Sequence, residues 1–218
     1  MVEIRYLARR MLDDKELDLA KHLKILLADN EMNSGKLILE IIPVYWETDG
    51  DKKRTIEPDG IYRPLFYVHM YGGLMNFENF SRSFLCFLSG HLECCLIQLI
   101  LKTPVQRNAS KPYGQLVHGL MKKGKISESL GQDLLDFNGA VNVPSKHFGA
   151  YQPTNWLDER TFAIEEASYA FVLTRHLSIQ LFTKLESSGV KLPHKWPEFN
   201  DDWLSQFPPV ERILFPKN

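Results

Sequence analysis

The sequence lacks any run of about 18 uncharged apolar residues, the length that a membrane-spanning helix needs. Its first residues, MVEIRYLARRMLDDKELDLAKHL, carry charges throughout and contain no apolar stretch of the kind found in a signal peptide. We therefore expect a soluble, cytoplasmic protein that does not bind membranes.

Cysteine is scarce, and the three that occur lie together in one apolar segment, at Cys86, Cys94 and Cys95. An odd, clustered set with two adjacent members is a poor disulfide framework. This usage is typical of a reducing compartment, which agrees with the cytoplasmic expectation.

Motifs for common catalytic chemistry are also missing: there is no Gly-x-Ser-x-Gly elbow, no glycine-rich phosphate loop and no HExxH. His91, Cys94 and Cys95 have helical spacing, but no second ligand pair accompanies them, and zinc usually takes four ligands. We interpret them as core residues and expect no metal and no cofactor. The net charge of −1 gives no overall basic surface for a polyanion, although a local basic patch remains open.

What the sequence does contain is helical periodicity in a chain of 218 residues that is 44% hydrophobic. We predict a mainly α protein, an antiparallel helical bundle with an irregular N-terminal insertion that holds a short strand or hairpin. One domain is expected, divided into an N-terminal helix and irregular segment (1–75), a helical core (76–189) and a strap rich in proline and aromatic residues (190–218).

Within this plan the first helix spans about 4–28 with an interruption near Asp13, and the segment 76–102 is the strongest helix. A short helix ends at Gly124, and Ser127 opens the next. A long helix runs from 157 or 158 to 188, and Gly189 ends it.

Three charged groups on these helices favour ordinary structural interpretations. Glu165 and Glu166 point about 100° apart, so we expect a solvated or bundle-edge face. Arg175 and His176 are interpreted as a surface arginine beside a half-buried histidine. The lysines of the turn after the short helix are placed where cations stabilise a helix C-terminus, which favours capping over phosphate binding; they are Lys122, Lys123 and Lys125.

The stretch FNGAVNVPSKHFG, 137–149, contains two amide side chains followed by an imidazole, which is more than a loop needs. Pro144 disfavours a helical Val143 and lacks an amide hydrogen, so the preceding helix is expected to stop or kink there. Asn138 and Asn142 share a helix face, and Lys146 and His147 follow the break. Either these residues form a binding site, or the asparagines cap loose backbone groups and the histidine packs on the bundle.

The run LVHGLMKKGKISESLGQDLLDFNGAVNVPSKHFG resembles the two-helix unit of HEPN-like proteins, in which a helix, a Gly-x-Ile-Ser turn and a second helix lead into an Arg-Asn-x-x-x-His or Asn-x-x-x-Lys-His ending. The resemblance covers about residues 115–149. In the ribonucleases of that group, an arginine and a histidine meet across a dimer and activate a ribose 2′-hydroxyl without a metal.

Here His147 matches the motif histidine, but Asn142 stands where those enzymes have arginine, and Lys146 is the nearby cation. An amide brings no positive charge to a phosphoryl transition state. The resemblance therefore implies a homodimer whose site, at Asn138, Asn142, Lys146 and His147, binds a ligand, RNA or nucleotide, or a protein partner without catalysis.

Two alternatives stay open. One is a metal-independent endoribonuclease of toxin type, with His147 as the catalytic acid or base. The other is a structural scaffold whose aromatic tail, with Trp196, Trp203 and Phe207, docks a partner.

Overall fold

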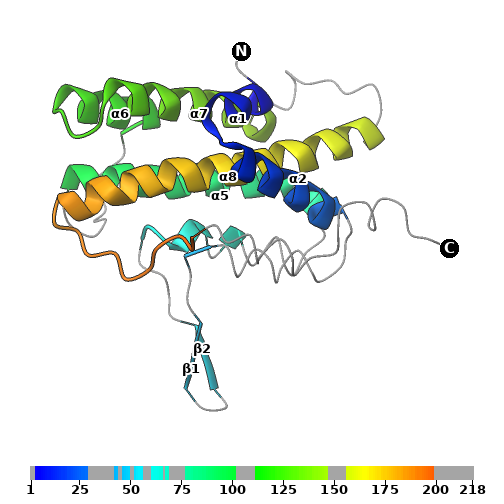
Figure 1. Cartoon of the computed structure of the whole chain (residues 1–218), viewed down its shortest axis with the longest axis horizontal. Helices are drawn as coiled ribbons and strands as arrows, with labels where there is room; N and C mark the ends of the chain where they lie inside the picture. The colour runs from blue at the N-terminus through cyan, green and yellow to red at the C-terminus, as the bar shows by residue number, and fades with distance from the viewer. Residues whose placement is uncertain are drawn as a thin grey trace.

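The computed structural model describes residues 3–28, 42–43, 46–49, 52–55, 60–65, 67–68, 77–101, 111–146 and 156–198, and the structural statements below refer to these. The protein is mainly helical, and its helices pack against one another (Figure 1). The elements are α1 (Ile4–Met11), α2 (Asp14–Ala28), the strands β1 (Trp46–Asp49) and β2 (Lys52–Thr55), and the helices α5 (Phe77–Leu101), α6 (Tyr113–Lys122), α7 (Glu128–Lys146) and α8 (Trp156–Ser187).

Helices α5 and α8 form the centre of the bundle, with α2 against α8 and the pair α6 and α7 on the other side (Figure 1). The predicted stripe of α5 is confirmed where its side chains are described, because they are all buried: Phe84, Leu88, His91, Cys95 and Leu99. The inner face of α8 is buried in the same way at Ala170, Leu173, Leu177 and Leu181. Each such leucine contributes about 1.5–3 kcal/mol by leaving water, so this pair of faces supplies much of the driving force.

Helix α5 contains the one described segment, Ser83–Leu101, that is long and apolar enough to cross a membrane by length and composition alone. The central helix of a globular core passes the same test. In this structure the helix packs against α6, α7 and α8, which accounts for its apolar character.

The predicted interruption of the first helix is confirmed, since α1 and α2 are separated at Leu12 and Asp13. The Asp13 carboxylate accepts the amide of Glu16 at 2.8 Å, and the Glu16 carboxylate accepts the amide of Asp13 at 3.4 Å. This reciprocal pair is a capping box, which satisfies two amides that the start of a helix otherwise leaves unpaired.

The turn between α6 and α7 also follows the prediction. Gly124 has φ +63°, a left-handed conformation that favours glycine, and it follows the end of α6. The amides of Gly124 and Lys125 donate to the carbonyls of Met121 and Leu120, both at 2.9 Å. Ser127 Oγ then accepts the amide of Leu130 at 3.2 Å, so it caps α7.

The helix does not stop where Pro144 was expected to break it, because α7 continues to Lys146. A proline costs a helix the hydrogen bond that its own amide would donate to the carbonyl four residues earlier. At Pro144 this loss falls in the last turn of α7, where few intrahelical bonds remain to be disrupted. The prediction of a stop at Val143 was therefore wrong, while the alternative of a kink at Pro144 stays a prediction.

The predicted hairpin in the irregular N-terminal insertion is present as β1 and β2, which pair antiparallel from Trp46 with Thr55 to Asp49 with Lys52. The hairpin projects away from the helices (Figure 1).

The described part of the C-terminal strap, 190–198, runs back along α8. Lys195 pairs with Glu186 at 2.8 Å, and Trp196 Nε1 donates to Ser178 Oγ at 2.7 Å. Because the partners on α8 move toward its start as the strap proceeds, the two segments are antiparallel. Trp196 is only 6% exposed, which agrees with a strap packed on the domain.

Two glycines of α7 should respond in opposite ways to alanine. A Cβ on Gly131 would lie 2.6 Å from Cγ of Met121, whereas a Cβ on Gly139 would meet nothing within 4 Å. We expect Gly139→Ala to stabilise the protein by about 0.5–1 kcal/mol through helix propensity. Gly131→Ala should be less stable than Gly139→Ala by about 1–3 kcal/mol, because Met121 must leave its position. Urea unfolding of both variants measures this difference, and equal stabilisation would contradict the close packing of α6 on α7.

Candidate functional site

The two asparagines of the predicted site lie on the second half of α7. Asn138 Oδ1 accepts a long hydrogen bond, 3.5 Å, from the hydroxyl of Ser89 on α5. Asn142 is half-buried, and its Oδ1 is buried with no hydrogen-bond partner among the described residues. Lys146 ends α7, but its side chain and all of His147 lie outside the described residues. The structure therefore places two members of the predicted site on one helix and leaves the meeting of amides, lysine and histidine untested.

Two arginines of α1 are engaged by carboxylates of neighbouring helices. Arg10 donates to Asp133 at 2.8 Å and to Asp136 at 2.9 Å, so it joins α1 to α7 and its pKa is raised. Arg5 lies 3.3 Å from the Glu165 carboxylate and 3.8 Å from that of Glu166, so it joins α1 to α8.

The sequence predicted a solvated or bundle-edge face for Glu166, but the side chain of Glu166 is buried. It is 3% exposed, and its Oε1 has no hydrogen-bond partner among the described residues, although Arg5 is nearby. Burial raises the pKa of Glu166 from 4.5 to about 7, against an opposing influence of Arg5. Glu165, its neighbour, is partly exposed and also pairs with Lys24 at 3.3 Å. The expectation failed because α1 covers this face of α8.

The interpretation of His91 and Cys95 as core residues is confirmed, since both are fully buried. His91 Nδ1 lies 2.7 Å from the carbonyl of Ile61, which can only accept, so Nδ1 carries the proton. Nε2 then accepts from the Ser178 hydroxyl at 2.7 Å, and Ser178 accepts from Trp196. Burial lowers the pKa of His91 to about 4.

This serine and histidine are within the distance that a nucleophile and its base require. However, both side chains have no exposed surface, and the histidine is oriented by a backbone carbonyl instead of a carboxylate. Their geometry therefore supports a structural link between α5 and α8. Cys95 Sγ lies 3.9 Å from His91 Nε2. The single lone pair of this nitrogen already accepts the hydrogen bond from Ser178, so it is not available to the thiol.

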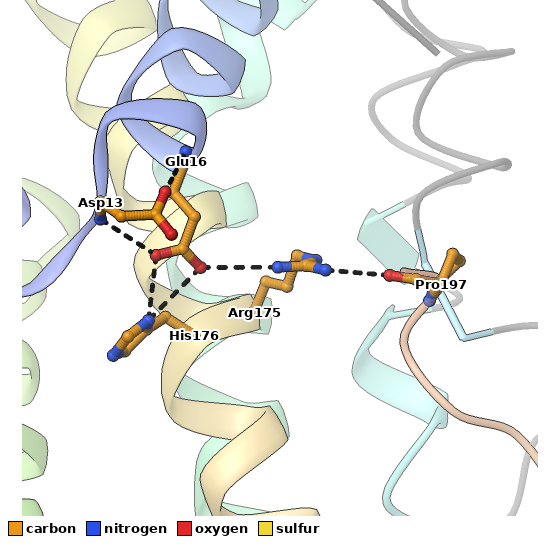
Figure 2. A network of polar contacts seen from close by, with 5 residues as sticks. All are labelled: Asp13, Glu16, Arg175, His176 and Pro197. Atoms are coloured by element: carbon orange, nitrogen blue, oxygen red, sulfur yellow. Dashed lines mark hydrogen bonds and ion pairs between the residues drawn. The ribbon is translucent and has the colours of Figure 1, made fainter. Parts of the chain in front are cut away.

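A second polar network joins the start of α2 to the middle of α8 (Figure 2). The Glu16 carboxylate of the capping box lies 3.1 Å from His176 Nδ1 and 3.5 Å from Arg175 Nη1. Arg175 Nη2 donates to the carbonyl of Pro197 at 2.9 Å, which fastens the strap. Arg175 is 6% exposed, so the prediction of a surface arginine was wrong, while the half-buried His176 agrees with it.

Glu16, the residue that organises this network, was not predicted from the sequence. Its signal was present, because Asp13 and Glu16 have the spacing of a capping box. That signal predicts the local hydrogen bonds but not the partners on α8, which are about 160 residues away in sequence.

No cluster of three or more histidine, cysteine or acidic side chains suited to a metal ion occurs among the described residues. In the alternative of a structural scaffold, Trp196 was one of the aromatic residues expected to dock a partner. Trp196 is instead buried against its own chain. Trp203 and Phe207 lie outside the described residues.

Comparison of the chain with protein-family models, with curated proteins and with solved structures finds no match.

The two strongly shifted groups predict an unusual pH dependence of stability. Between about pH 4.5 and 7 the folded state holds a proton on Glu166 that the unfolded chain has released, so rising pH weakens folding. Between about pH 4 and 6.5 the unfolded chain protonates its histidine while folded His91 stays neutral, so rising pH strengthens folding. The two effects oppose each other over most of this range.

Glu166→Gln should separate them. We expect the stability of this variant relative to the wild type to increase as the pH rises from about 4.5 to 7, by roughly 3 kcal/mol in total. Urea unfolding at several pH values measures the difference. A constant offset between the two proteins across this range would mean that Glu166 is not buried in its protonated form.

Proposed function

We propose that this protein is a HEPN-like, cytoplasmic, homodimeric binding protein that uses the end of α7 to hold a ligand, RNA or a protein partner and does not cleave RNA. The observation that carries the proposal is Asn142, whose buried amide oxygen has no hydrogen-bond partner among the described residues. An unpaired buried oxygen costs about 1–3 kcal/mol, which a donor from a bound partner would recover.

The absence of catalysis is supported by the charges around α7. Asn142 is neutral, and a catalytic site for phosphoryl transfer needs a cation near the reacting phosphate. The described arginine that contacts α7, Arg10, is already held by Asp133 and Asp136. Arg5 is held by Glu165 and Glu166 on α8. Neither guanidinium replaces the missing motif arginine without breaking an ion pair.

Location in a reducing compartment is supported by the cysteines. All three are free, with Cys86 exposed, Cys94 partly buried and Cys95 buried. Burial raises the pKa of the Cys94 thiol to about 11, which keeps it protonated and unreactive at neutral pH.

The non-catalytic proposal predicts that purified protein leaves single-stranded RNA intact in the presence of a metal chelator. The measurement is electrophoresis of a labelled RNA after prolonged incubation. His147→Ala is the test variant, and His22→Ala, a partly exposed histidine of α2, is its control for contaminating nuclease. Cleavage by the wild type and by His22→Ala, but not by His147→Ala, would establish the ribonuclease instead.

The homodimer is a separate part of the proposal. The apolar faces of α5 and α8 are largely used inside the chain. The proposed two-fold contact therefore relies on the end of α7, where the two copies of His147 would approach each other.

Light scattering at micromolar concentration should give about twice the chain mass of 25.2 kDa. A dimer joined at the end of α7 should also dissociate when Asn142 is replaced by a charged residue, because the new charge would be buried against its own copy. A monomer mass for the wild type would exclude the dimer and any site composed from two chains.

A further inference from the structure

The outer face of α6 and the turn that follows it form a basic surface that the proposed site does not use. From Lys111 to Ser127 the chain contains four lysines and no acidic residue, although its net charge is −1. The lysines are Lys111, Lys122, Lys123 and Lys125. We call this surface, together with His118 and Gln115, the α6 face.

Helix α6 separates its apolar and polar residues cleanly. Its buried side comprises Tyr113, Leu116, Val117 and Leu120, which pack toward α5 and α7. The residues on the opposite side, Gln115, His118 and Lys122, are exposed and recur at helical spacing. Their exposure leaves this side of α6 open to solvent.

The lysines of the turn stabilise the dipole of α6 but are not needed to bind its last carbonyls. The carbonyls of Leu120 and Met121, which a cation would otherwise serve, already accept the amides of Lys125 and Gly124. None of the four ammonium groups has an ion-pair partner among the residues that the structure describes. Their charges are therefore available to a partner from solution.

Neighbouring acids offset this charge only in part. Asp133 and Asp136, on α7, share the single guanidinium of Arg10, so this cluster keeps one negative charge, and Asp136 also accepts from Gln132 at 2.7 Å. Glu128, in the first turn of α7, is exposed and close in sequence to the turn. The α6 face keeps a local positive field that the composition of the whole chain hides.

We propose that the α6 face binds the phosphate backbone of a single-stranded nucleic acid. The inference deepens the proposed binding function, on which it rests, by naming the partner and a contact surface apart from the end of α7. Donors at Gln115, His118 and Lys122 are spread over about 10 Å of helix, at 1.5 Å per residue, which suits a repeating anion better than a single phosphate.

The chemistry of the face favours nucleic acid over an acidic protein. A protein interface usually has an apolar centre, but the large exposed apolar side chains of the described residues lie elsewhere, at Tyr6, Tyr67, Leu101 and Ile179. The face also has no exposed aromatic ring on which a base could stack, since Tyr113 is buried. Binding is therefore expected to be independent of sequence and strongly weakened by salt.

The test uses the full chain and a fluorescein-labelled oligouridylate of about 20 nucleotides, with affinity measured by fluorescence anisotropy at several salt concentrations. Replacing Lys111, Lys122, Lys123 and Lys125 with glutamine should weaken binding at least tenfold. The slope of log K against log salt should fall by about 0.7 for each lysine that contacts a phosphate. Because Lys125 is partly buried, a second variant keeps it and changes the three exposed lysines.

The matched control removes the same charge elsewhere, by changing Lys21, Lys184, Lys191 and Lys195 to glutamine. These lysines are exposed and lie on α2, α8 and the strap. We expect the control to bind within about threefold of the wild type. Equal losses in both variants, or a wild type that does not bind the oligonucleotide, would overturn the inference.

Two further measurements separate this inference from the proposed function. A polyglutamate peptide that competes as well as the oligonucleotide at equal charge would indicate an acidic protein partner and reject the nucleic acid. Electrophoresis of the bound RNA shows whether it stays intact. Cleaved RNA with lysine-dependent binding would refute the non-catalytic function and support the inference about the α6 face. Intact RNA without lysine-dependent binding would refute the inference about the α6 face and agree with the non-catalytic function.

Discussion

The neutral imidazole of His91 is the constraint on which the packing of the core depends, because its two nitrogens hold different segments of the chain. The donors run in one direction, from Trp196 to Ser178, from Ser178 to Nε2, and from Nδ1 to the carbonyl of Ile61. This relay connects the strap, α8, α5 and the segment before α5. A proton on Nε2 would bury a charge without a carboxylate beside it and would reverse the bond from Ser178, so the fold selects one tautomer.

The periphery of the bundle depends on charge instead. Glu16 caps α2 and also binds His176 and Arg175, so one carboxylate both starts a helix and docks it on α8. Arg175 then extends the contact to the strap. Such a buried ion pair contributes less net stability than its geometry suggests, because both charges are desolvated. Its stronger effect is to fix where α2 and the strap lie along α8.

The sequence predicted the helices, turns and caps that depend on residues close together in the chain. Helical spacing located α5 and α8, Gly124 and Ser127 marked the turn between α6 and α7, and Asp13 marked the break before α2. It failed for Glu166 and Arg175, because the α1 and α2 residues that surround them lie far away in the chain. The candidate site shows the same difference between local and long-range features. The shared helix face of Asn138 and Asn142 was predictable from their spacing. Whether Lys146 and His147 approach these amides depends on tertiary structure.

The same long-range pairing explains why net charge is a poor guide to the surface of this protein. Its arginines Arg5, Arg10 and Arg175 are used where carboxylates are half-buried or buried, since a planar guanidinium can bind several oxygens at once. Each of these guanidinium groups offsets part of the charge of the carboxylates that it binds. Lysine has a compact, strongly hydrated charge, and the four lysines of the α6 face stay on the surface without an ion-pair partner among the described residues. The potential that a partner meets is therefore set by the charges left over after folding, and these are distributed unevenly although the formal sum is −1.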